Sequence, residues 1–295
     1  MEKENPLSTG LAVRLAARDK TLMTPTAGLA PSYLQANLIV LPSRYASDFR
    51  LLCQRNPVPC PLLAESSFPG AYSSLTWHLP LPTSHPSRQN MDIDLRQDAP
   101  KYRIYKDGIP TDSESDPLRI TSYWDKTDHI GFLIGCSYSF ENALAEAGLP
   151  PRYVLQGRNV AMYRTKIPLA PAGVFTRATW VVSMRPYRVE DVERVREVTR
   201  EFGRTHGEPV DWGWDAVERL GIEDITRPEW GEAARTEDGE GVFDQGEEGW
   251  VPVFWGCGVT PQEAVMKAGL KGTVLAHSPG HMIVLDLLDE EVKGL

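Results

Sequence analysis

Two segments that lie far apart in the chain place the same kinds of residues in the same order. Residues 130–141 and 251–263 each read as an apolar strand, a Gly-Cys turn, a small hydroxylic residue and the start of a helix. A helix start presents unpaired N–H groups and the positive end of a dipole, which together bind carboxylates or phosphates. One such turn is equally explained by the need for glycine and a cap. The pair favours a site for a small acidic ligand.

Hydroxyls and thiols in the two segments supply candidate ligand contacts. Ser137, Ser139 and Thr260 could donate hydrogen bonds, and Cys136 and Cys257 sit at the helix starts, where the pKa of a thiol falls. Buried cysteines also serve as small core residues, and no base adjoins either cysteine. Substrate contact is therefore favoured over covalent catalysis.

The candidates for proton transfer are two histidines and one glutamate. His277 and His281 flank Ser-Pro-Gly, which cannot form the helix on which zinc-binding histidine pairs lie. This spacing favours a hydrogen-bonding or acid–base role, and Glu141 follows the first Gly-Cys turn. A metal-dependent hydratase that uses both histidines with Glu141 or Asp286 is the least favoured alternative. We predict no metal and no cofactor, since the chain has no phosphate-binding or dinucleotide motif.

Two arginines, an amide and a phenol are further candidates for binding the substrate. On a strand, Arg158 would share one face with other alternate residues, whereas Asn159 and Tyr163 would share the other. A solvated edge strand explains this segment equally well. Arg185 ends another apolar strand, where its guanidinium could hold a carboxylate through two hydrogen bonds.

Local periodicity predicts the elements that position these residues. The second Gly-Cys turn leads into Thr260-Pro-Gln-Glu263, which is typical of a helix capping box. We expect helices at residues 9–19, after Ser43 and at 189–202; strands at 35–41, 153–168 and 179–184; and a strand, turn and strand around residues 277–281.

Strand, turn and helix units of this kind predict an α/β fold. We expect a mixed-sheet α/β sandwich domain (residues 1–152 and 250–295) that holds both Gly-Cys units in one sheet, and a smaller inserted α+β domain (residues 153–231). Residues 232–249 carry seven acids, one base and four glycines, which predicts a disordered acidic insertion. The length of 295 residues suits one large domain or two ordinary ones.

The composition of the chain excludes several classes of molecule as its binding partner. The net charge of −9 argues against nucleic acid, and no apolar stretch approaches the length of a membrane span. The four cysteines form no CxxC pair, which argues against a disulfide scaffold. The amino-terminal residues have no apolar signal core and carry early acids, so we predict the cytoplasm over the mitochondrion. A small acidic metabolite is the expected partner, and a homo-oligomer is left open.

Eight motifs, in order from Thr24 to Leu287, resemble the D-glutamate cyclase family, whose bacterial members are labelled hydro-lyases. They are Thr26-Ala-Gly-Leu-Ala-Pro, Gln35-Ala-Asn-Leu, Cys53-Gln-Arg-Asn-Pro-Val-Pro-Cys-Pro-Leu, Ile134-Gly-Cys-Ser-Tyr-Ser-Phe-Glu, Arg158-Asn-Val-Ala-Met-Tyr-Arg-Thr, Val182-Ser-Met-Arg-Pro, Phe254-Trp-Gly-Cys-Gly-Val-Thr-Pro-Gln and His277-Ser-Pro-Gly-His-Met. The chain departs from the family pattern at Ala161, Lys166 and Asp211, where proline, asparagine and histidine are usual.

The resemblance implies a two-domain lyase that converts D-glutamate to 5-oxo-D-proline with loss of water. It implies no particular catalytic residues. The candidates above would divide between proton transfer, binding of carboxylates and orientation of the substrate chain. The alternatives are a hydro-lyase that acts on another small carboxylic acid and an acid-binding module without chemistry.

Overall fold

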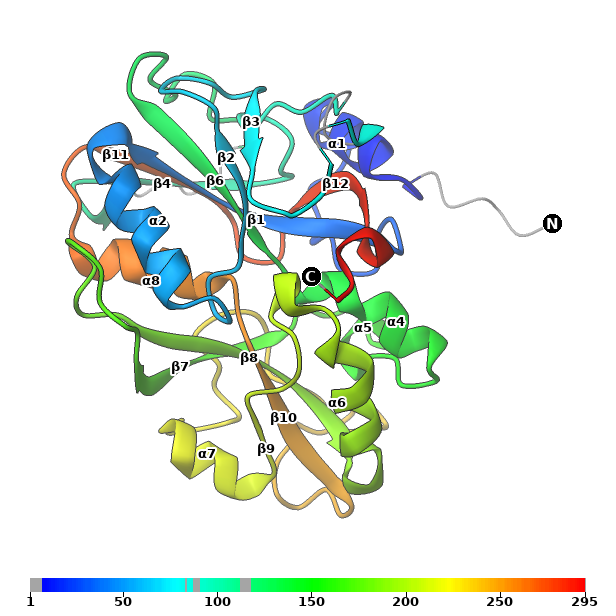
Figure 1. Cartoon of the computed structure of the whole chain (residues 1–295). Coiled ribbons are helices and arrows are strands. Elements are labelled where there is room, and N and C mark those ends of the chain that lie inside the picture. The colour runs from blue at the N-terminus through cyan, green and yellow to red at the C-terminus, as the bar shows by residue number, and fades with distance from the viewer. Residues whose placement is uncertain (1–6, 83, 87–90, 112–117, 295) are drawn as a thin grey trace.

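A computed structural model describes residues 7–82, 84–86, 91–111 and 118–294. It contains two sheets, which Figure 1 shows one above the other, with α4 (Glu141–Glu146) and α5 (Arg152–Leu155) at the level where they meet. The first sheet has the order β3-β2-β6-β1-β11-β4-β5, and β12 also pairs with β1. Its strands are β1 (Tyr33–Pro42), β2 (Leu62–Ser66), β3 (Leu75–Trp77), β4 (Tyr102–Lys106), β5 (Ile109–Pro110), β6 (His129–Gly135), β11 (Thr273–His277) and β12 (Ile283–Leu288).

The central strand β1 is buried along almost its whole length because both of its faces are covered. Leu38 and Val40 pack into one core cluster, whereas Ile39 and Leu41 pack into another on the opposite face. One edge of β1 pairs with β6 from Ala36 to Pro42. The other edge is shared, because β12 pairs with its first half and β11 with its second.

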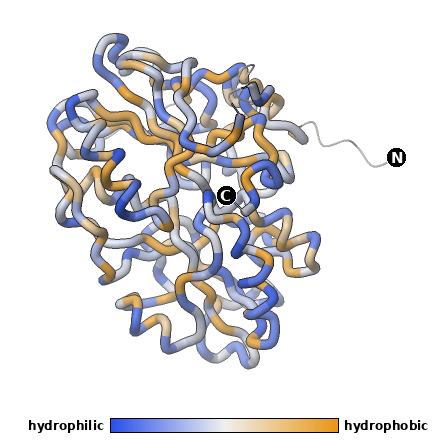
Figure 2. Tube along the Cα trace, viewed as in Figure 1, coloured by the Kyte–Doolittle hydropathy of each residue, from blue (hydrophilic) through white to orange (hydrophobic). Residues whose placement is uncertain are grey.

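The second sheet has the order β7-β8-β10-β9. Its strands are β7 (Ala161–Pro168), β8 (Thr179–Arg188), β9 (Asp211–Trp212) and β10 (Trp250–Gly256), and α6 (Val192–Arg200) and α7 (Trp214–Leu220) belong to the same part of the chain. Figure 2 shows that apolar segments follow the strands of both sheets and that hydrophilic segments lie in outer loops and helices.

The predicted α/β class is confirmed, but the expected sheet is not. Every strand pairing among the described residues is antiparallel, not mixed. The two Gly-Cys units do not share a sheet, because β6 lies in the first sheet and β10 pairs with β8 and β9 in the second. The strand that opens residues 250–295 is therefore not part of the sheet of β1. Periodicity identifies a strand, whereas its partners are set by distant residues.

Most expected helices are present, and one expected strand begins late. Helix α1 (Gly10–Arg18) starts at Thr9, whose Oγ1 accepts a hydrogen bond from the Ala12 N–H at 3.2 Å. Helix α2 (Ala46–Arg55) follows a short 3-10 turn at Ser43–Tyr45. The strand predicted from residue 153 is wrong over its first part, because α5 occupies Arg152–Leu155 and β7 begins at Ala161.

The acidic stretch 232–249 is packed and not disordered, contrary to the prediction. Phe243 is buried and stacks on Trp214 with 5.1 Å between ring centroids. Arg235 and Val242 form a β-bridge, and the Glu247 carboxylate lies 2.9 Å from the Arg152 guanidinium. The burial of Phe243 and the ion pair of Glu247 therefore hold this segment in place despite its high content of acids and glycines.

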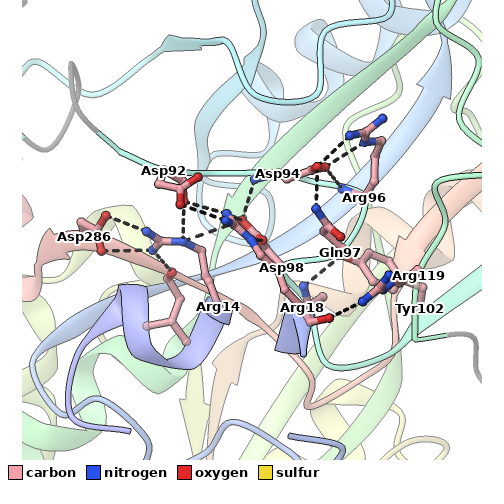
Figure 3. Close-up of polar contacts among 12 residues, drawn as sticks. Arg14, Arg18, Asp92, Asp94, Arg96, Gln97, Asp98, Tyr102, Arg119 and Asp286 are labelled. Carbon is pink, nitrogen blue, oxygen red and sulfur yellow. Dashed lines mark hydrogen bonds and ion pairs between the residues drawn. The ribbon is translucent and has the colours of Figure 1, made fainter. Parts of the chain in front are cut away.

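Helix α1 is fixed to the first sheet by a network of arginines and aspartates (Figure 3). Arg14 is fully buried and pairs with Asp286 of β12 at 2.6 Å, and Arg18 pairs with the buried Asp98 at 2.6 Å. Asp286, which the metal-dependent alternative combines with the two histidines, instead accepts hydrogen bonds from Arg14 on both of its carboxylate oxygens.

Within the part of the chain that the structure describes, no helix combines the length and apolar character that crossing a membrane requires.

Candidate active site

The two Gly-Cys turns meet in one buried cluster between the sheets, although their strands belong to different sheets. We call this set the junction cluster: Cys136, Tyr138, Tyr153, Val160, Met162, Val181, Cys257, Val259 and Met282. Seven of its members fall in four of the eight motifs, and the other two are Tyr153 in α5 and Val181 in β8. Helix α8 (Val259–Ala268) begins within the cluster. Of the predicted site, the structure brings the two Gly-Cys turns close to each other.

The glycines of these turns admit protein backbone and not a ligand. A Cβ atom at Gly135 would lie 2.0 Å from the carbonyl oxygen of Arg204. A Cβ atom at Gly256 would lie 3.2 Å from the Val58 carbonyl oxygen and 3.3 Å from Nδ1 of His206. Gly135 therefore allows the turn around residues 203–206 to approach β6, and Gly256 allows the segment at Val58 to approach β10.

A buried ion pair lies directly behind the first turn. Nε of Arg185 donates to Oε1 of Glu141 at 3.0 Å, and Nη2 donates to the same oxygen. The hydroxyl of Tyr153 lies 2.6 and 2.7 Å from the two Glu141 oxygens. Arg185 also donates to the Ser137 and Ser183 hydroxyls at 3.0 and 3.1 Å. The predicted carboxylate clamp thus holds a carboxylate of the protein itself.

Aromatic rings surround the Arg185 side of this pair. Arg185 is fully buried, and its guanidinium lies over the Phe140 and Trp255 rings at 5.3 and 5.1 Å from their centroids. Burial raises the pKa of Glu141, and the positive charge of Arg185 and the Tyr153 hydroxyl oppose that rise. The carboxyl group therefore gains a proton more readily than an exposed glutamate does.

The cysteines are poor nucleophiles in this setting. Burial raises the pKa of Cys257 to about 11, and it raises the pKa of Cys136 further. The expected lowering at a helix start is overturned because burial outweighs the dipole of the short turn that follows Cys136. Both side chains are thiols at neutral pH.

His277 is the last residue of β11, which shares one edge of β1 with β12. The Leu38 N–H donates to Nδ1 of this histidine at 3.0 Å, and Nε2 of Gln262 lies 3.1 Å from the same nitrogen. Burial lowers the pKa of His277 to about 3. The neutral ring accepts a hydrogen bond from the backbone of β1, as a backbone carbonyl of a paired strand would. The geometry therefore supports a structural role and not the predicted proton transfer.

His281 and Asn159 lie at the junction. The Tyr138 hydroxyl donates to Oδ1 of Asn159 at 2.8 Å. A Cβ atom at Gly280 would lie 2.6 Å from Nδ2 of Asn159, so the 277–281 turn contacts this amide. His281 is 9% exposed, and its Nδ1 lies 3.1 Å from the Pro279 carbonyl oxygen.

Four other predicted residues bond elsewhere. Arg158 pairs with Glu232 at 3.0 Å, and the Tyr163 hydroxyl donates to the Ile225 carbonyl at 2.6 Å in a different core cluster. The Ser139 hydroxyl accepts from the Gln35 N–H at 2.9 Å. Thr260 forms no capping box, because α8 begins at Val259 and the Thr260 hydroxyl bonds to both backbone groups of Val181.

Acid is expected to destabilise the protein through His277. Between pH 6.5 and about 3 the unfolded chain holds a proton on this histidine that the folded chain does not, so stability falls as the pH falls. In His277→Asn the free energy of unfolding should therefore drop less between pH 7 and pH 4.5 than in the wild type. Urea unfolding at the two pH values measures the difference, and an equal drop in both proteins would contradict it.

A cavity of about 220 Å³ opens beside the ion pair. Its lining includes Gln35, Tyr138 and Glu141 on the junction side, and Ser32, Asn142, Val154, Leu155 and Asp289 elsewhere. Sequence reasoning missed Tyr138, Tyr153 and Asp289. Tyr138 lies inside a quoted motif, whereas Asp289 follows the last motif and carries no sequence signal. Among the described residues, no group of three or more His, Cys, Asp or Glu side chains is placed to hold a metal ion.

Comparison with known proteins places the chain in a family. The profile described as D-glutamate cyclase matches residues 130–286, which include both Gly-Cys turns, Arg185 and His281. The chain belongs to the D-glutamate cyclase family. It is 45% identical to a protein of Bordetella petrii (97% of each chain) and 42% identical to YcsI of Bacillus subtilis (96% of this chain, 98% of that one). A Schizosaccharomyces pombe protein is 39% identical over 96% of this chain and 86% of its own.

All three relatives carry the name "Putative hydro-lyase". The predicted family and the predicted lyase class are confirmed. The positions where this D-glutamate cyclase family member departs from the motifs lie away from the ion pair. Lys166 donates to the Glu218 carbonyl at 3.1 Å, Asp211 pairs with Arg219 at 2.7 Å, and Ala161 packs into the core of the second sheet.

Proposed function

We propose that this lyase converts D-glutamate into 5-oxo-D-proline and water. The substrate nitrogen forms a bond to the carbon of the distal carboxylate, and one C–O bond of that carboxylate breaks. Two protons leave the nitrogen and depart on the oxygen as water, so the reaction needs no oxidant or reductant. It needs one group that takes a proton, one that gives a proton, and a site that excludes bulk water.

The observation that carries the proposal is the cavity of about 220 Å³ that is lined by Glu141. Arg185 and Tyr153 hold the Glu141 carboxyl in one orientation, and burial raises its pKa. A carboxyl in this state is suited to protonate the departing oxygen. A cavity of this volume accommodates a five-carbon amino acid.

The other predicted residues divide by what they contact. Tyr138 lines the cavity, its hydroxyl donates to Asn159, and His281 follows Gly280, which lies against that amide. We assign these three residues to orienting the substrate. Arg185 and Ser137 position Glu141. We leave Arg158, Tyr163, Ser139 and Thr260 out of the site because their polar atoms bond to the protein elsewhere. Cys136 and Cys257 pack in the junction cluster as thiols.

Proton NMR tests the proposal directly. The purified protein is incubated with D-glutamate in one tube and with L-glutamate in another. Growth of 5-oxoproline signals from the D isomer alone is the expected result. No turnover of either isomer, with and without added divalent metal ions, would overturn the proposed substrate and favour another small carboxylic acid. The predicted cytoplasmic location and the homo-oligomer stay predictions.

A further inference from the structure

The lining of the cavity includes a buried carboxyl group with an oxygen that has no hydrogen-bond partner among the described residues. Asp289 begins a 3-10 turn (Asp289–Val292) directly after β12 and is 5% exposed. Its Oδ1 is buried without a hydrogen-bond partner within the described part of the chain. Its backbone N–H is satisfied by the Ser32 carbonyl at 2.8 Å, so the turn itself is well fixed.

The other buried carboxylates of the described residues show how unusual this is. Each of the five has an arginine partner: Glu65 with Arg50, Asp94 with Arg96, Asp98 with Arg18, Glu141 with Arg185 and Glu263 with Arg164. Burial of a carboxylate without a counter-charge is costly, and proteins normally pair such groups. The sixth, Asp289, is part of the cavity lining and has no arginine partner among the described residues.

The residues that line the cavity limit which ligand can bind the Asp289 carboxyl. Pro31, Ala145, Pro151, Val154 and Leu155 make much of it apolar, and Glu141 is the second carboxyl. Among the residues that the structure describes, no Lys, Arg or His side chain lines it. The described lining therefore offers two carboxyl groups and no cationic side chain. A ligand with an ammonium group on a short chain supplies what is missing.

From this geometry we infer that Asp289 binds the ammonium group of the substrate and takes its first proton. The inference rests on the proposed function, because it assigns the base for the same cyclisation. Burial raises the pKa of Asp289 to about 8, which brings it towards the range in which an amine gives up a proton. Asp289 lies outside the matched family profile, which ends at residue 286.

The proton steps balance with Glu141 as the second group. Asp289 removes one proton from the ammonium, and the nitrogen lone pair then forms the C–N bond. Glu141, which starts as the carboxylate of its ion pair with Arg185, takes the second proton from the nitrogen and gives it to a carboxyl oxygen. Asp289 gives its proton to the same oxygen as the C–O bond breaks, so water departs and both side chains are carboxylates again.

The first test is the pH profile of D-glutamate turnover. In the wild type, kcat/KM is expected to rise as the pH rises through about 8, where Asp289 loses its proton. The titratable groups that share the cavity are Tyr33, Tyr138 and Glu141. On the same turn lie Glu290 and Glu291, and Glu291 pairs with His85. Asp289→Asn should lower kcat/KM by about 10²-fold or more and abolish this rise.

The matched control is Glu290→Gln, which removes the same charge from an exposed neighbour on the same turn. It should leave the rate and the pH profile unchanged. Asp289→Asn is expected to fold, because it removes an unpaired buried carboxyl, and a thermal melt checks this. Asp289→Ser is the second variant for the case in which the asparagine protein fails to fold.

The second test separates this inference from the proposed function. Ligand-observed NMR compares the affinity for D-glutamate with that for glutarate, which has the same carbon chain and carboxylates but no amine. The wild type should bind D-glutamate at least tenfold more tightly, and Asp289→Asn should bind both alike.

If this difference in affinity is observed without turnover, the ammonium site stands and the proposed reaction fails. If turnover occurs while the affinity ratio and the pH profile survive in Asp289→Asn, the reaction stands and the inference is overturned. Binding of neither ligand would overturn both.

Discussion

Replacement of Arg185 by methionine is expected to lower the free energy of unfolding by about 3–5 kcal/mol. The substitution leaves the Glu141 carboxylate buried without the guanidinium that now contacts it. It also removes the donor for the Ser137 and Ser183 hydroxyls. Urea unfolding followed by tryptophan fluorescence measures the loss, since Trp255 lies beside Arg185.

Two further variants show whether the loss comes from the unpaired charge. Arg185→Met combined with Glu141→Gln keeps an acceptor for the Tyr153 hydroxyl but removes the charge, and should recover most of the stability. Arg188→Met, on the same strand, breaks an exposed pair with Glu237 and should cost at most about 1 kcal/mol. A double variant as unstable as the single one would show that the ion pair is not the source.

The second large effect is expected from Gly135→Ala. A Cβ atom at this position would lie 2.0 Å from the Arg204 carbonyl oxygen and 3.2 Å from the Thr205 Cα, both of which are backbone atoms. Neither can rotate away, so β6 or the 203–206 turn must move by more than 1 Å, and we expect a loss of about 3 kcal/mol. The midpoint of thermal or urea unfolding reports it.

The comparison for this variant is Gly246→Ala. The added Cβ atom would there meet only the Oδ1 end of the Asp244 side chain at 3.0 Å. Such a side chain can move, so the stability should change by less than about 0.5 kcal/mol. Equal losses in the two alanine variants would mean that the close approach at Gly135 carries no special cost.

Local sequence features predicted the elements well where the signal was local. Thr9 caps α1, and the apolar run at residues 35–41 forms β1, because capping and burial depend on residue types that are close in the sequence. The partner of a strand depends on distant segments and cannot be identified from the strand's own residues. The sequence could not show that β10 joins β8, or that Phe243 anchors an acidic loop on Trp214.

The candidate site was predictable in its residues but not in their relations. Arg185 and Glu141 were both candidates, yet their contact spans 44 positions and turns an expected substrate clamp into an ion pair. His277 was expected to carry protons, but its ring completes a strand ladder. Residue type suggests chemistry, whereas burial and neighbours decide whether that chemistry is available.

The divided edge of β1 has a consequence for synthesis of the chain. On the ribosome, β1 emerges early and pairs with β6 within the first half of the protein, but its other edge stays open. That edge is closed only by β11 and β12, which are translated nearly last. Through most of its elongation the nascent chain therefore carries an apolar strand with one open edge, and an open strand edge promotes aggregation. Stalled or carboxy-terminally truncated products that lack β12 should be substrates for chaperones and proteases.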